Sequence, residues 1–96
     1  MTRIRITVEG RAVEAALNNT ETAQMIFAAL PLEAHVSVWG DEIYFRIPVE
    51  LNESADAQVE VSVGALAYWP PAKAFCIFYG PTPVSRGHEP RAYSPV

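Results

Sequence analysis

Short segments in which apolar and polar residues alternate, separated by Gly or Pro turns, make up most of this chain. Alternation with a period of two is the pattern of a half-buried β-strand, because successive side chains of a strand point to opposite faces. The segments that alternate in this way, or are apolar on both faces, are residues 3–8, 11–17, 34–39, 42–47, 59–63, 65–69 and 74–79. The sequence therefore predicts a mainly β fold, a small barrel or closed sheet.

One segment, about residues 20–30, has helical spacing instead. Thr20 is a suitable N-cap, and Pro31 disfavours helical geometry in the residue before it. The apolar residues between them recur at i, i+3, i+4 and i+7, which predicts one buried stripe: Ala23, Ile26, Phe27 and Leu30. A helix of about eleven residues is too short to be stable alone in water, so we expect it to pack on a sheet.

The size and composition predict one folded domain over residues 1–96. Hydrophobic residues make up 50% of the chain and charged residues 19%, which is too apolar for a disordered protein. No apolar run reaches the roughly 18 residues that would cross a bilayer, and the start of the chain lacks the apolar block of a signal peptide. A single cysteine excludes an internal disulfide framework. We therefore expect a soluble, cytoplasmic protein with no membrane partner.

The charge argues against a nucleic-acid partner. Seven basic and eleven acidic residues give a net charge of −4, whereas nucleic-acid binders usually carry a basic excess that neutralises phosphates. The five glycines are scattered at turns and form no phosphate-binding loop. The sequence thus predicts no nucleic-acid binding and offers no cofactor motif.

Three residues that often carry chemistry are in unpromising surroundings here. His35 and His88 lie far apart in sequence, and neither has a neighbour at metal-ligand spacing, so we predict no metal site. Cys76 lies within the apolar run 74–78, where burial would raise its pKa and make it inert. The favoured interpretation of Cys76 is a structural core residue.

Three stretches of the chain resemble a known family. They read WGDEIYF with IPV in residues 39–49, AYWPP with KA and CIF in residues 67–78, and GPTP with SRG in residues 80–87. In this the chain is similar to the small prokaryotic cyclophilin-like proteins, a family of unknown function found in archaea and bacteria. The resemblance implies a closed, eight-stranded cyclophilin-type β-barrel with a helix at one end.

The resemblance also raises a question about the end of the chain. Family members usually continue past the Ser-Pro-Val of residues 94–96 into further β structure. The chain is therefore either a short member or one that lacks the family's last β segment. A barrel without that strand would leave an open edge, and an open edge can pair with a second copy. This makes a homodimer, an assembly module, one of the functions to consider.

Arg46 is the candidate for catalysis that the resemblance implies. Cyclophilins are peptidyl-prolyl isomerases, in which an arginine holds the proline carbonyl beside an apolar pocket. The segment Phe45-Arg46-Ile47-Pro48 is similar to the cyclophilin segment Phe-His-Arg-Ile-Ile-Pro, but the Gly-rich run that should follow is absent. Arg46 is therefore either the electrostatic catalyst of a weak or specialised isomerase or an exposed strand residue.

The aromatic residues suggest a binding groove as an alternative to plain core packing. They are concentrated in the matching stretches, and strand parity places Glu42, Tyr44 and Arg46 on one row, predicted to face outward. The predicted ligand-binding residues are Glu42, Tyr44, Trp69 and Phe78, the last two as walls. The function favoured by the sequence is binding of a small molecule or a proline-containing peptide in this groove.

Overall fold

The computed structural model describes residues 2–96 and divides them into two compact units. The first extends to Leu30 and the second runs from Pro31 to Val96. Each unit is described by itself below, and a single domain over the whole chain stays a prediction. Within the described residues, no helix is long and apolar enough to cross a membrane.

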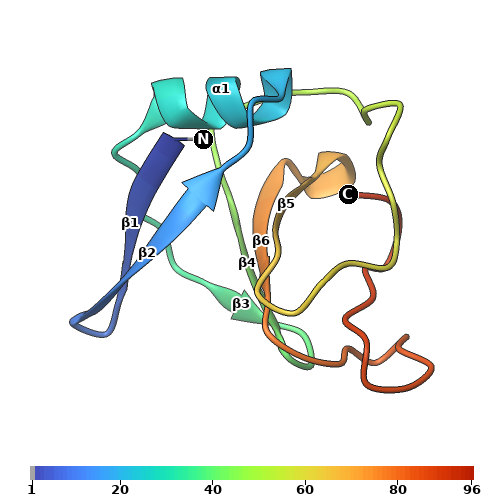
Figure 1. Cartoon of the computed structure of the whole chain (residues 1–96). Coiled ribbons are helices and arrows are strands. Elements are labelled where there is room, and N and C mark those ends of the chain that lie inside the picture. Colours follow the sequence, from blue (N-terminus) through green and yellow to red (C-terminus); the bar gives the residue numbers. More distant parts are fainter. Residues whose placement is uncertain (1) are drawn as a thin grey trace. The chain divides into compact units, whose positions relative to one another are not determined.

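The first unit begins with a β-hairpin made of the first two predicted strands (Figure 1). Strands β1 (Thr2–Val8) and β2 (Arg11–Leu17) pair antiparallel along their whole length, from Thr2 opposite Leu17 to Val8 opposite Arg11. The two turn residues, Glu9 and Gly10, both have positive φ values, 51° and 79°. Two such residues match the right-handed twist of the strands, which is why a two-residue loop can close this hairpin.

The predicted helix is confirmed as α1 (Glu21–Ala29). Thr20 is its N-cap, since the Thr20 hydroxyl oxygen accepts a hydrogen bond from the backbone N–H of Ala23 at 3.2 Å. Ala23 and Ile26 are buried, but Phe27 is half exposed, so the buried stripe is narrower than the spacing predicts. The helix ends at Ala29, and its C-cap Leu30 directly precedes Pro31.

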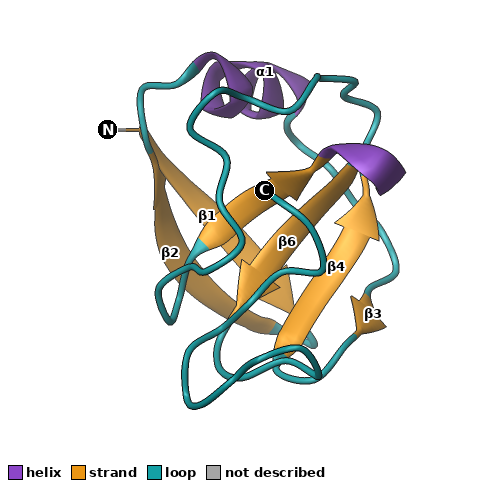
Figure 2. Cartoon of the chain, turned by 90° about the vertical axis from the view of Figure 1, so that its right-hand side faces the viewer, coloured by secondary structure: helices purple, strands orange, loops and turns teal. Residues whose placement is uncertain are grey.

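The second unit is built on a four-stranded antiparallel sheet with the order β3-β4-β6-β5. Its strands are β3 (Ser37–Val38), β4 (Glu42–Arg46), β5 (Leu66–Trp69) and β6 (Ala74–Phe78). The two Pro residues after β5 form a short 3-10 turn, η1 (Pro70–Ala72), that leads into β6. Figure 2 shows β4 and β6 side by side in this sheet.

The predicted closed barrel is not formed. Residues 2–96 make a two-stranded and a four-stranded sheet, and neither closes on itself. Of the predicted strand 34–39, only Ser37 and Val38 form a strand, β3. In place of the predicted strand 59–63, the structure has one isolated bridge between Glu60 and Arg91.

Proline explains why that bridge does not grow into a ladder. Residues 58–61 exchange backbone hydrogen bonds with the last residues of the chain, including Ala92 N–H to Val59 O at 2.8 Å and Val96 N–H to Gln58 O at 3.0 Å. Pro90 and Pro95 lie in the same run and have no N–H to donate. The two segments are thus held together as an irregular pair.

All three stretches that carry the family resemblance meet in space, because β4 of the first pairs with β6 of the second and the first also contacts the third. The turn between β3 and β4 rests on the loop after β6, with the Asp41 N–H donating to Pro81 O and the Tyr79 N–H donating to Asp41 O, both at 2.9 Å. Gly40 has a φ of 60°, and a Cβ there would lie 2.8 Å from Thr82 Cα. Only glycine suits both the backbone angle and this close approach.

The strand register defines two faces of the four-stranded sheet. Glu42 lies opposite Phe78 and Tyr44 opposite Cys76, so these side chains share one face, here called the Glu42 face. Its core consists of Ala74, Cys76, Phe78 and Ala92. The other face carries the Phe45–Phe75 ring stack, with centroids 5.4 Å apart. Tyr68, on that face too, donates its hydroxyl to Val49 O at 2.7 Å.

Candidate functional site

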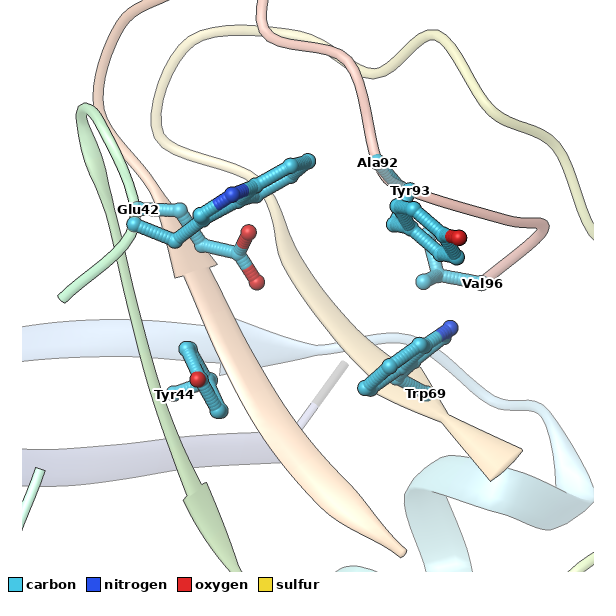
Figure 3. Close-up of a pocket in the computed structure, with 7 residues that line it drawn as sticks. Glu42, Tyr44, Trp69, Ala92, Tyr93 and Val96 are labelled. Atoms are coloured by element: carbon cyan, nitrogen blue, oxygen red, sulfur yellow. The ribbon is translucent and has the colours of Figure 1, made fainter. Parts of the chain in front are cut away.

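The Glu42 face carries a pocket of about 200 Å³ that lies entirely within the second unit (Figure 3). It is lined by Trp39, Glu42, Tyr44, Trp69, Ala92, Tyr93 and Val96. Strand β4 supplies the carboxylate and one phenol, the end of β5 and the β3–β4 turn each supply an indole, and the C-terminal segment supplies the rest. Four of the seven lining residues are aromatic.

Hydrogen bonds and ring contacts hold the aromatic walls in place. The Trp69 indole N–H donates to the Ser94 hydroxyl at 2.6 Å. Tyr93 packs edge-to-face against both indoles, with its ring centroid 6.3 Å from that of Trp39 and 6.2 Å from that of Trp69. Such edge-to-face pairs are favourable beyond the area they bury. Tyr93 is 73% exposed and therefore forms the rim of the pocket.

The loop before Tyr93 is held by a carboxylate of its own, Glu89. Its carboxylate accepts hydrogen bonds from the backbone N–H groups of Arg86 and Gly87 at 2.9 and 2.7 Å, and from Arg91 Nε at 3.1 Å. The backbone donor at Arg86 is the largest reason that the pKa of Glu89 is lowered to about 2. Arg91 also forms an ion pair with Glu60, at 3.1 Å, so its guanidinium is already occupied.

Glu42 is in the opposite situation. It is only 5% exposed, and its carboxylate points into the space between Tyr44 on one side and Trp69 and Tyr93 on the other (Figure 3). Burial raises the pKa of Glu42, and a hydrogen bond with the Cys76 thiol opposes that rise. The salt bridges within residues 2–96 use four other glutamates: Glu14, Glu50, Glu60 and Glu89. Within this range, no basic residue is paired with Glu42.

Cys76 lies beneath Glu42 and is buried, as the sequence predicts. Burial is the largest cause of a strongly raised pKa for this thiol, and the negative charge of Glu42 raises the pKa further. The group therefore stays a thiol near neutral pH and is a poor nucleophile. Its role here is to pack the core and to donate a weak hydrogen bond.

The structure brings three of the four predicted ligand-binding residues to one pocket. Glu42, Tyr44 and Trp69 all line it. Glu42, predicted to lie on an outward row that lines a groove, is buried, because the C-terminal segment covers this face of the sheet. Phe78 lies in the same sheet face but is fully buried and belongs to the core beneath, not to the lining.

Arg46, the predicted catalytic residue, lies outside the pocket. It is the last residue of β4, on the same row as Glu42 and Tyr44, and it is exposed. Of the three residues in that row, Glu42 and Tyr44 line the pocket and Arg46 does not. The isomerase arrangement that the resemblance implies, an arginine beside an apolar pocket, is therefore not the one built around this cavity.

The sequence prediction missed more than half of the pocket lining. Trp39 carried a signal, because it belongs to the motif-bearing stretch, but its place in a turn hid the direction of its ring. The C-terminal lining residues Ala92, Tyr93 and Val96 follow no strand period, so nothing in their sequence shows which face they cover. Among residues 2–96 there is no group of three His, Cys, Asp or Glu side chains that could hold a metal.

Comparison with known proteins establishes the family. The family model described as cyclophilin-like matches residues 2–96, and the chain belongs to this cyclophilin-like family. The chain is also similar to the hypothetical protein AF2241 from Archaeoglobus fulgidus, whose solution structure superimposes with a TM-score of 0.73 at 34% identity. The match covers 98% of this chain and 79% of that one. No curated protein was found to match.

Proposed function

We propose that this protein binds a small organic ligand in the pocket on the Glu42 face. The observation that carries the proposal is the combination of four aromatic walls with one buried carboxylate around an open space. Ligand sites are typically concave and mostly apolar, with a few polar groups that orient the ligand. Ordinary core packing would instead fill the space, because protein interiors leave few voids larger than a water molecule.

The size of the pocket narrows the kind of ligand. About 200 Å³ is below the roughly 300–1,000 Å³ of sites that take drug-sized molecules. A small molecule fits this space, and so does a single side chain or head group of a longer ligand. A proline-containing peptide could present only one ring to it.

Binding is favoured over isomerase chemistry by the position of Arg46. A prolyl isomerase lowers part of a barrier of about 20 kcal/mol by binding the twisted amide better than the planar one. A guanidinium at the amide is the group that would do this, and the exposed Arg46 is not part of the pocket lining. Dimerisation through a sheet edge stays a prediction.

The two tryptophans of the chain make the proposal directly testable. Both line the pocket, so their indole N–H resonances and the whole tryptophan fluorescence report on its occupancy. We would titrate a panel of small neutral, cationic and anionic organic molecules, including an alanyl-proline dipeptide, and follow both signals. Saturable changes at both indoles are expected for at least one member.

A pair of matched variants separates pocket binding from surface binding. Val96→Phe places a larger side chain in the lining, whereas Val84→Phe makes the same change at an exposed position outside it. We expect the first variant to abolish the saturable changes and the second to keep them. Titrations that stay flat across the panel, or that respond equally to both variants, would contradict the proposed function.

A further inference from the structure

We propose that the pocket on the Glu42 face selects a ligand that carries a quaternary or heavily alkylated ammonium group. This inference rests on the proposed function and names the chemical class of its ligand. The cation would sit among the rings of Trp39, Tyr44, Trp69 and Tyr93, beside the carboxylate of Glu42. Three features of the pocket lead to this class.

The first feature is a buried negative charge that no basic residue of the described chain offsets. Glu42 is 5% exposed and takes part in none of the ion pairs within residues 2–96. Burying a carboxylate away from water is unfavourable unless it is paired or hydrogen-bonded. The Cys76 thiol that opposes the rise in its pKa is a weak donor, and the same thiol hydrogen-bonds the Ala74 carbonyl oxygen at 3.8 Å. A cationic ligand would supply the missing partner.

The second feature is the chemistry of the walls. The negative faces of indole and phenol rings attract a cation within about 6 Å of the ring centroid, and aromatic cages recognise quaternary ammonium groups in this way. The Trp69 N–H is engaged by Ser94, so this residue offers its ring to the pocket and not its donor. Tyr93 stands edge-on to both indoles and links them into one wall.

The third feature is the mostly aromatic and aliphatic character of the lining, which favours an ammonium that brings no N–H donors. A primary ammonium has three N–H donors to satisfy, and a guanidinium has five. The side chains of the lining offer four acceptor oxygens, two on the Glu42 carboxylate and one on each phenol, which is fewer than a guanidinium needs, and the other lining side chains are apolar or offer rings. A quaternary ammonium has no N–H group and only needs apolar contact and a counter-charge. An anionic ligand is disfavoured, because Glu42 would repel it.

The test compares a cation with its neutral carbon analogue. Choline and 3,3-dimethylbutan-1-ol have nearly the same shape, and only choline is charged. We would titrate both into the full chain and follow the two indole resonances. We expect choline to bind about tenfold or more tightly than the alcohol, since a desolvated cation–π contact and a nearby carboxylate act together.

Glu42→Gln keeps the shape of the side chain and removes its charge. We expect this variant to weaken choline binding about tenfold and to change the affinity for the alcohol less than twofold. Glu53→Gln removes the same charge at an exposed position outside the lining, and should behave as the unaltered chain. Tyr93→Leu, at a 73% exposed rim position, removes a ring without touching the core and should also weaken choline more than the alcohol.

The outcomes separate this inference from the proposed function. Equal binding of choline and the alcohol, or equal loss of both in Glu42→Gln, would overturn the ammonium assignment while leaving a binding pocket. Indole shifts with other members of the panel and none with choline would do the same. If no molecule moves either indole, both proposals fail.

Discussion

Two of the glutamates in the second unit, Glu42 and Glu89, have opposite surroundings. Glu89 lies in the C-terminal loop and accepts hydrogen bonds from two backbone N–H groups and from Arg91. Glu42 lies in the strand face under the aromatic walls, nine-tenths buried, with a thiol as its hydrogen-bond partner. The pKa of Glu89 is accordingly lowered, and that of Glu42 is raised.

The difference separates a structural carboxylate from a candidate functional one. Every contact of Glu89 tightens the loop that carries Ala92 and Tyr93 into the pocket wall, so its charge serves the fold. The charge of Glu42 gains little from its surroundings within the described residues and faces an open space. A buried charge that lowers the stability of the fold and faces a pocket is a reason to look for a ligand.

The largest effect on stability is expected from truncating Phe78, in the core of the Glu42 face. Phe78 lies opposite Glu42 across β4 and β6 and is fully buried, so Phe78→Ala would leave a cavity in the core of this face. We expect it to lower the free energy of unfolding by about 3–5 kcal/mol. Denaturant unfolding followed by tryptophan fluorescence measures this, because both tryptophans lie in the second unit.

Two further variants keep this prediction open to contradiction. Phe27→Ala makes the same truncation at a half-exposed helix position and should change the stability much less. Phe78→Leu is the milder core variant for ligand titrations. If Phe78→Leu weakened ligand binding severely without a loss of stability, Phe78 would be a ligand contact, as the sequence alone suggests.

The sequence could predict the local elements because their signals are local. Alternation marks β1, β2 and β4, runs that are apolar on both faces mark β5 and β6, and the Thr20 cap with Pro31 marks the helix. Closure into a barrel depends on pairing between distant segments, and the single bridge between Glu60 and Arg91 shows where such pairing stops. Three of the seven lining residues come from a loop without periodicity, so their placement could not follow from residue spacing.

The second prediction concerns the stability contributed by the two carboxylates. Glu42→Gln removes a buried charge that has no cationic partner among residues 2–96, so we expect it to raise the free energy of unfolding at pH 7 by about 1–3 kcal/mol. Glu89→Gln should lower it, because a charged acceptor is lost from three donors. Opposite signs in parallel denaturant titrations are the expected result.

The stability gained in Glu42→Gln should also depend on pH. A carboxyl whose folded pKa is raised above its ordinary 4.5 favours folding at low pH, and that contribution is lost as the pH rises through the raised folded value. The gain from Glu42→Gln should therefore grow as the pH increases above about 4.5. A gain that is the same at pH 4 and pH 8 would show that Glu42 is not destabilised by its charge.

A smaller effect is expected from the bond that orients the pocket wall. Ser94→Ala leaves the Trp69 indole N–H without its acceptor, which we expect to lower stability by about 1 kcal/mol. The Trp69 indole resonance should shift or broaden at the same time. Ser62→Ala, at an exposed position, is the matched control and should leave both unchanged. An unmoved Trp69 resonance in Ser94→Ala would mean that ring packing alone orients this wall.

The smallest effect belongs to Glu89, because its carboxylate is close to solvent and its contribution is screened. Its pKa of about 2 in the folded chain lies below the ordinary 4.5, so its contribution to stability is complete above about pH 4.5 and is lost as the pH falls toward 2. Over that acid range the unaltered chain should lose its advantage over Glu89→Gln. An NMR titration of the Glu89 carboxyl carbon tests the cause directly. A midpoint near 4.5 would show that the loop donors do not hold this carboxylate, and the contrast with Glu42 would then rest on burial alone.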